Sequence, residues 1–136
     1  MRTILRLALL LAPGLVQAQA IQEAITPAQY FECQIAAQKA TITGLEERVK
    51  LNQKINATAA EKRQAGEVSR ARVTMVMYGC GQQNAATLGA YAHRNADQLQ
   101  AYLAANPQVQ ARLEATGQRI AELSRQMPAV SPSAKR

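Results

Sequence analysis

The two cysteines are the residues whose chemistry this sequence defines most clearly. Cys33 and Cys80 are the only cysteines of the 136-residue chain, and the midpoint between them falls within the turn signal Asn56-Ala57-Thr58. If two helices fold back at this turn, the two thiols lie level with each other and can form a disulfide. Two buried free thiols are the alternative. No Cys-x-x-Cys pair is present to tune a thiolate for redox catalysis, so we predict a structural disulfide, worth about 4 kcal/mol in the chain-entropy model.

No other residue pattern indicates catalysis or ligand coordination. The single histidine, His93, has no His-x-x-x-His partner, and the disulfide would consume both thiols, so we predict no metal site and no cofactor. The nine acidic residues are scattered at helix-surface spacings, without a pair placed for acid–base chemistry. We therefore expect that the protein is not an enzyme and acts by binding.

Basic residues exceed acidic residues by 16 to 9, and the segment from Pro27 to Tyr78 alone carries eight lysines and arginines against five glutamates. The candidate basic interaction face consists of Lys54, Lys62, Arg63, Arg70 and Arg72. Such a face would attract an acidic protein partner or an anionic polymer of the bacterial envelope, whereas a mixed surface of this kind is also typical of a solvated helix. No nucleic-acid-binding module or aromatic stacking platform is recognisable, so we predict no nucleic-acid partner.

The elements that position these residues are preceded by a predicted signal peptide over residues 1–20. Arg2 and Arg6 give a positively charged start, an apolar stretch follows, and Ala18-Gln19-Ala20 is a small-x-small cleavage site. A buried N-terminal helix is the alternative. The apolar stretch is too short to span a bilayer, and we predict no membrane span in the mature chain from Ile21 onward. We expect a periplasmic or secreted protein, in a compartment that permits disulfides.

The mature chain is predicted to be all-α, because no segment alternates with the period of two that strands require. We expect a disulfide-stapled helical hairpin within a small up-down four-helix bundle, in one domain over residues 21–128. The third helix is expected from near Gln82 to Leu103, and the fourth from Pro107 to Met127. Residues 129–136 are predicted to be a disordered basic tail.

The hairpin helices are expected to begin at Pro27 and Ala59, each after a capping box, and to turn at Asn56. The predicted inward stripe of the first helix is Phe31, Ile35, Ile42, Leu45 and Val49. The predicted inward stripe of the second is Ala65, Val68, Ala71, Met75 and Tyr78. The alternative is one continuous helix from Pro27 to Tyr78, which would separate the cysteines and favour intermolecular pairing.

The segment Ile25-Thr26-Pro27-Ala28-Gln29 resembles the L-T-x-x-Q signature of small periplasmic helical proteins that act as stress chaperones or metal-resistance sensors. It departs from that signature at Ile25, and the signature does not recur, so no functional residue is carried over. Our first hypothesis is a secreted, non-enzymatic helical binding or accessory protein of the bacterial envelope that acts through a protein partner. The alternative is a small periplasmic holdase-like stress chaperone.

Overall fold

The computed structural model describes residues 25–81 and 85–128, and these residues form helices and no strand. The helices are α1 (Pro27–Gln53), α2 (Ala59–Gly79), α3 (Ala85–Arg94), α4 (Ala96–Ala105) and α5 (Pro107–Arg125). The all-α prediction is therefore confirmed for the described residues. The predicted signal peptide over residues 1–20 and the predicted tail over residues 129–136 lie outside them. None of the described helices is long and apolar enough to cross a membrane.

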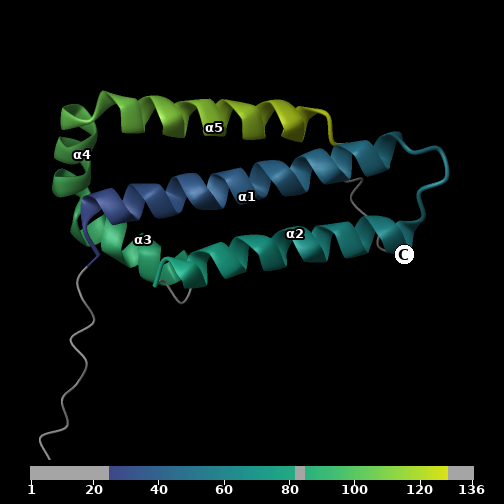
Figure 1. Cartoon of the computed structure of the whole chain (residues 1–136), viewed down its shortest axis with the longest axis horizontal. Coiled ribbons are helices and arrows are strands. Elements are labelled where there is room, and N and C mark those ends of the chain that lie inside the picture. Colours follow the sequence, from purple (N-terminus) through teal and green to yellow (C-terminus); the bar gives the residue numbers. More distant parts are fainter. Residues whose placement is uncertain (1–24, 82–84, 129–136) are drawn as a thin grey trace, which may run out of the picture.

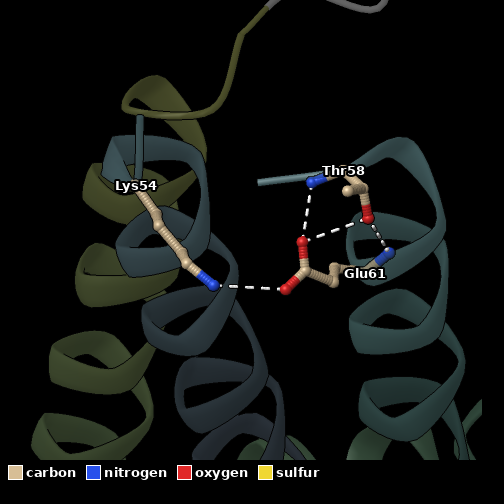
Figure 2. Close-up of polar contacts among 3 residues, drawn as sticks. All are labelled: Lys54, Thr58 and Glu61. Carbon is tan, nitrogen blue, oxygen red and sulfur yellow. Dashed lines mark hydrogen bonds and ion pairs between the residues drawn. The ribbon is translucent and has the colours of Figure 1, made fainter. Parts of the chain in front are cut away.

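Both hairpin helices begin at the predicted capping boxes. The Thr26 hydroxyl accepts a bond from the Gln29 backbone N–H at 3.2 Å, and the Gln29 side chain accepts one from the Thr26 N–H at 2.9 Å. At the start of α2, Thr58 and Glu61 make the same reciprocal pair, and Lys54 Nζ lies 3.2 Å from the Glu61 carboxylate (Figure 2). Since α1 ends before this turn and α2 begins after it, the continuous-helix alternative is excluded.

The central helix is α1, which lies between α5 and α2 (Figure 1). It is buried on two sides. Phe31 and Ile35 belong to the predicted stripe, whereas Cys33, Ala40 and Gly44 are buried as well. At about 100° of rotation per residue, these three lie on the opposite side of the helix from Phe31. The stripe predicted from large apolar residues therefore accounts for only one of the two buried faces.

The second buried face of α1 packs closely against α2. A Cβ added at Gly44 would lie 2.6 Å from the Cβ of Ser69, so the backbones are too close there for a larger residue. Cys33 and Cys80 lie at disulfide distance, with Cα atoms 5.8 Å apart. From the Cys33–Cys80 contact to the Gly44–Ser69 contact, the residue number increases along α1 and decreases along α2. The two helices are therefore antiparallel, as the hairpin prediction requires.

On its other side α1 packs against α5, and the two helices run parallel. Side-chain pairs advance together along both helices: Glu32–Arg112, Gln38–Thr116, Glu46–Arg119 and Asn52–Met127. An up-down four-helix bundle would place its fourth helix antiparallel to its first. That prediction is wrong for the described residues, in which α5, α1 and α2 lie side by side in one layer (Figure 1).

The topology differs because the predicted third helix is divided at Asn95. Asn95 has φ −118° and ψ 23°, and its side-chain amide donates to the Tyr91 carbonyl at 2.8 Å. Asn106 repeats this bond with the Tyr102 carbonyl at 2.8 Å, where α4 ends. Asparagine amides compete with the helical backbone in this way. The resulting short helices, α3 and α4, return the chain at one end of α1, so α5 starts there (Figure 1).

A cluster of buried apolar residues lies at the same end of the molecule, whereas Val49 and Leu123 are buried farther along α1 and α5. The buried members of the cluster are Phe31, Ile35, Leu99 and Val109. The Phe31 ring stacks on the Tyr102 ring with centroids 5.7 Å apart, and the Tyr30 and Tyr91 rings lie 5.4 Å apart. Aromatic pairs of this kind add to the free energy gained by burial. These contacts join α1 to α3 and α4, and they involve the single phenylalanine and three of the four tyrosines of the chain.

Candidate interaction surface on the second helix

The side of α2 that meets α1 is formed by small and half-buried residues. Ser69 faces Gly44, and Cys80 faces Cys33. Ala65 and Val76 share this side at helical spacing and are also half-buried. No residue of α2 is fully buried. Because the two backbones approach closely at Gly44 and Ser69, only small side chains fit at that point of the contact.

Apart from Ala65, the predicted inward stripe of α2 lies on the other side of the helix and is exposed, so the prediction is wrong for four of its five residues. Val68 is 46% exposed, Met75 is 73% exposed and Tyr78 is 62% exposed. Ala71 between them is exposed as well. We call Val68, Ala71, Met75 and Tyr78 the outer stripe. Its spacings of three, four and three residues match those of a helix-pairing seam.

The predicted basic face is divided by the structure into two groups. Lys54 pairs with Glu61 at the turn, at 3.2 Å. Arg72 donates two bonds to Glu47 across the α1–α2 contact, at 3.0 and 3.2 Å. These two cations therefore help to hold the hairpin together. Because both ion pairs are exposed, solvent and salt screen their contribution to stability.

The remaining three predicted cations, Lys62, Arg63 and Arg70, come together around one cavity. It has a volume of about 370 Å³ and lies between α1 and α2. We call it the basic pocket; its lining residues are Arg48, Lys62, Arg63, Gly66, Glu67 and Arg70. Among the described residues, none of its four cations forms an ion pair with a carboxylate.

Arg48 is the pocket cation that was not among the predicted site residues; Gly66 and Glu67 were not predicted either. Arg48 lies on α1, whereas the predicted face was drawn mainly along α2. The position of the turn in the sequence could have indicated that Arg48 belongs to this group. Folding the chain back about Asn56-Ala57 brings Arg48 level with Ala65, which is next to Gly66. The position of the turn, which pairs Cys33 with Cys80, therefore also places Arg48 beside the basic residues of α2.

The pocket cations are unpaired because the carboxylates are used elsewhere. Four of the five glutamates of α1 and α2 pair outside the pocket: Glu32 with Arg112, Glu46 with Arg119, Glu47 with Arg72, and Glu61 with Lys54. Two of these partners come from α5. Glu67 is the one carboxylate left beside four cations, so the electrostatic potential of the pocket is positive.

Two of the paired carboxylates, Glu32 and Glu61, are stabilised in their charged form by their partners. The hydrogen bond from Arg112 lowers the pKa of Glu32. The backbone N–H of Thr58, followed by the ammonium of Lys54, lowers the pKa of Glu61. The carboxylate of Glu32 in turn raises the pKa of Arg112. These groups are exposed, so solvent screens the associated energies.

The candidate chemistry of the other residues is limited. His93 lies exposed on α3. Over residues 25–81 and 85–128, no three or more histidine, cysteine, aspartate or glutamate side chains are grouped so that they could hold a metal ion. The described part of the molecule therefore offers two surface features for binding, the outer stripe and the basic pocket.

Comparison with known proteins does not add to this description. No family model matches the chain, and neither does a curated protein or a solved structure. The chemistry of α2 and of its contact with α1 is therefore the basis for assigning a function.

Proposed function

We propose that the chain is an exported, non-enzymatic helical binding protein of the bacterial envelope that docks the outer stripe of α2 on a protein partner. The exposure of Met75 (73%) and Tyr78 (62%) carries this proposal. An ordered helix usually buries its apolar stripe. Here α2 packs on α1 through its small-residue side and leaves the larger apolar side chains facing outward.

The form of the outer stripe supports a helical partner. Its members recur at three- and four-residue spacing, which is how an amphipathic helix presents anchors to a second helix. Methionine and tyrosine supply large contact areas, and both are enriched in interfaces. Arg63 and Arg70 lie along one edge of the stripe. The partner is therefore expected to carry an apolar helix face with acidic residues along one side.

A disulfide between Cys33 and Cys80 would support this function by holding the stripe in place. Their Cα separation of 5.8 Å lies in the range that a disulfide requires. The bridge would join α1 to the end of α2 nearest Met75 and Tyr78. A partner would then meet a stripe that is already ordered, which lowers the entropic cost of binding. An oxidising compartment, as expected after export, favours the bridge.

The test is affinity purification from the native envelope fraction with three forms of the mature protein. We expect one stoichiometric partner to bind the parent protein and to be lost with Met75→Asp. The matched control is Ile55→Asp, because Ile55 is 97% exposed but lies in the turn, away from the stripe. Circular dichroism should be the same for all three. Retention of the partner by Met75→Asp would refute the proposal.

A holdase-like stress chaperone is the second candidate, and the exposed methionine favours it. Methionine side chains are flexible and polarizable, so surfaces that carry them adapt to unrelated apolar sequences. A chaperone would suppress the aggregation of several unrelated unfolded proteins, and Met75→Asp would abolish that suppression. Binding of one partner without such suppression would favour the first candidate.

A further inference from the structure

The basic pocket lies on a different side of α2 from most of the outer stripe and is a separate feature. Lys62, Gly66 and Arg70 recur every four residues and face the same side, whereas Met75 is about 140° around the helix from Arg70. We infer that the basic pocket binds a multivalent oxyanion of the phosphate class. This goes beyond the proposed partner function. Because Arg63 and Arg70 also border the outer stripe, the test variants change Arg48 and Gly66, which line only the pocket.

The charge of the pocket determines the class of ligand. Four cations and one carboxylate line it. A single carboxylate ligand would leave most of this positive charge unbalanced, whereas a group with several negative charges would match it. Three of the cations are arginines, whose planar guanidinium groups bind phosphate oxygens in a bidentate manner. The lining therefore fits a di- or polyphosphate, or closely spaced phosphomonoesters.

The geometry of the pocket admits such a group. Gly66 lies between Lys62 and Arg70 on α2 and carries no side chain. The nearest atom to a Cβ added there would be an Arg70 guanidinium nitrogen, at 3.8 Å, so the space above the helix is open. Arg48 approaches from α1. A cavity of about 370 Å³ holds several groups the size of a water molecule, each of which occupies about 30 Å³ in the liquid.

None of the four pocket cations forms an ion pair with another described residue. Each of the other glutamates on α1 and α2 already has an arginine or lysine partner. Clustered like charges destabilise a helix when they are close in space. A bound oxyanion would relieve that repulsion, so the ligand should raise the thermal midpoint of the protein as well as bind to it.

The experiment is isothermal titration calorimetry of the full mature chain with inorganic tripolyphosphate at low and moderate salt. We expect one site, weakened at higher salt. Arg48→Gln should weaken binding about fivefold or more, because it removes one charge-assisted contact. The matched control is Arg125→Gln on α5, which changes the net charge equally and lies outside the pocket. It should have little effect.

A second pair of variants separates a shaped site from general attraction to a basic protein. Gly66→Leu places an apolar side chain in the pocket without changing charge and should weaken binding, whereas Ala71→Leu, on the outer stripe, should not. The inference would be refuted if Arg125→Gln and Arg48→Gln weakened tripolyphosphate binding equally. Absence of binding to the parent protein, or unchanged binding by Gly66→Leu, would also refute it.

Two further probes identify the source of the phosphate. Vesicles of phosphatidylcholine with phosphatidic acid present a phosphomonoester on a lipid surface. The site is assigned to a lipid headgroup if the parent protein binds these vesicles more strongly than it binds tripolyphosphate. Arg48→Gln and Gly66→Leu should then both weaken binding to the vesicles. A polyglutamate peptide tests the other chemical class. If it binds the parent protein more tightly than either phosphate probe, the phosphate assignment is wrong.

Discussion

Replacing Gly44 with alanine should push the two helices of the hairpin apart. The added Cβ would lie 2.6 Å from the Ser69 Cβ, whereas ordinary van der Waals contact begins at 3.4 Å. Rotation of the Ser69 hydroxyl would not relieve this overlap, because the Cβ is fixed to the backbone. The helices must therefore separate by roughly 1 Å at this point, which also loosens the packing of the neighbouring residues.

The magnitude follows from two opposing effects. Overpacking of this kind costs about 1–3 kcal/mol, whereas replacing glycine by alanine within a helix gains about 1 kcal/mol. We expect Gly44→Ala to lower the free energy of unfolding by about 1 kcal/mol. Gly117 is the matched control, since it lies within α5 and nothing lies within 4 Å of a Cβ built on it. Gly117→Ala should stabilise the protein by up to about 1 kcal/mol.

The assay is urea denaturation followed by circular dichroism, with the cysteine pair oxidised in every variant. Ser69→Gly removes the opposing Cβ, so the double variant Gly44→Ala/Ser69→Gly should show a coupling energy of about 1–2 kcal/mol in favour of folding. If Gly44→Ala stabilises the protein as much as Gly117→Ala does, or if the coupling is zero, α2 does not approach α1 at Ser69.

Two other predictions concern the core and the α1–α5 contact. Ile35→Ala should lower the free energy of unfolding by about 2–4 kcal/mol, because Ile35 is 1% exposed. Ile55→Ala makes the same chemical change at a 97% exposed position and should stay within about 0.5 kcal/mol of the parent, so equal urea midpoints for the two variants would contradict the assigned core. Arg112 lowers the pKa of Glu32 below its ordinary 4.5, so the stability contributed by this carboxylate is present above pH 4.5 and is lost as the pH falls below it. Thermal midpoints recorded from pH 6 to pH 3 should fall less in Glu32→Gln than in the parent, and identical pH profiles would count against the pair.

The features that the sequence predicted correctly are those controlled by local chemistry. The capping boxes at Thr26 and Thr58 need only residues three positions apart, so they can be found without knowing the fold. Gly81 adopts φ +71° just after α2, a conformation that glycine favours. These signals fix where the hairpin helices begin and end. Because the two cysteines are equally far in sequence from the turn, they are then expected to lie beside each other.

The features that it missed depend on which faces are buried. A stripe of large apolar residues indicates one buried side of a helix, but α1 is buried on two. Its second side carries Ala40 and Gly44, which look unremarkable in a hydrophobicity pattern. For α2 the large residues Met75 and Tyr78 suggested the wrong side. The side that packs on α1 is the one with small residues, because the two backbones approach closely there. Nothing in the apolar spacing marked Asn95 as the point where a helix divides.

The candidate site was predicted in part for a similar reason. Lys62, Arg63 and Arg70 were chosen for their charge, and the structure brings them together around one pocket. Lys54 and Arg72 were chosen on the same basis but pair with carboxylates. Composition reveals an excess of positive charge, whereas the pairing of each residue depends on the tertiary contacts, including those made by α5.

The central claim is that an exported chain carries α2 on α1 in a hairpin closed by Cys33 and Cys80. Non-reducing tryptic mapping of the protein from the envelope fraction tests it directly. Trypsin cleaves after lysine and arginine, so the account predicts that residues 21–39 will be found cross-linked to residues 73–94 in the monomer. That single species would establish both cleavage after Ala20 and the intramolecular bridge. Free thiols in the exported protein, bridges between two identical peptides, or a stable form that retains Met1 would contradict the account.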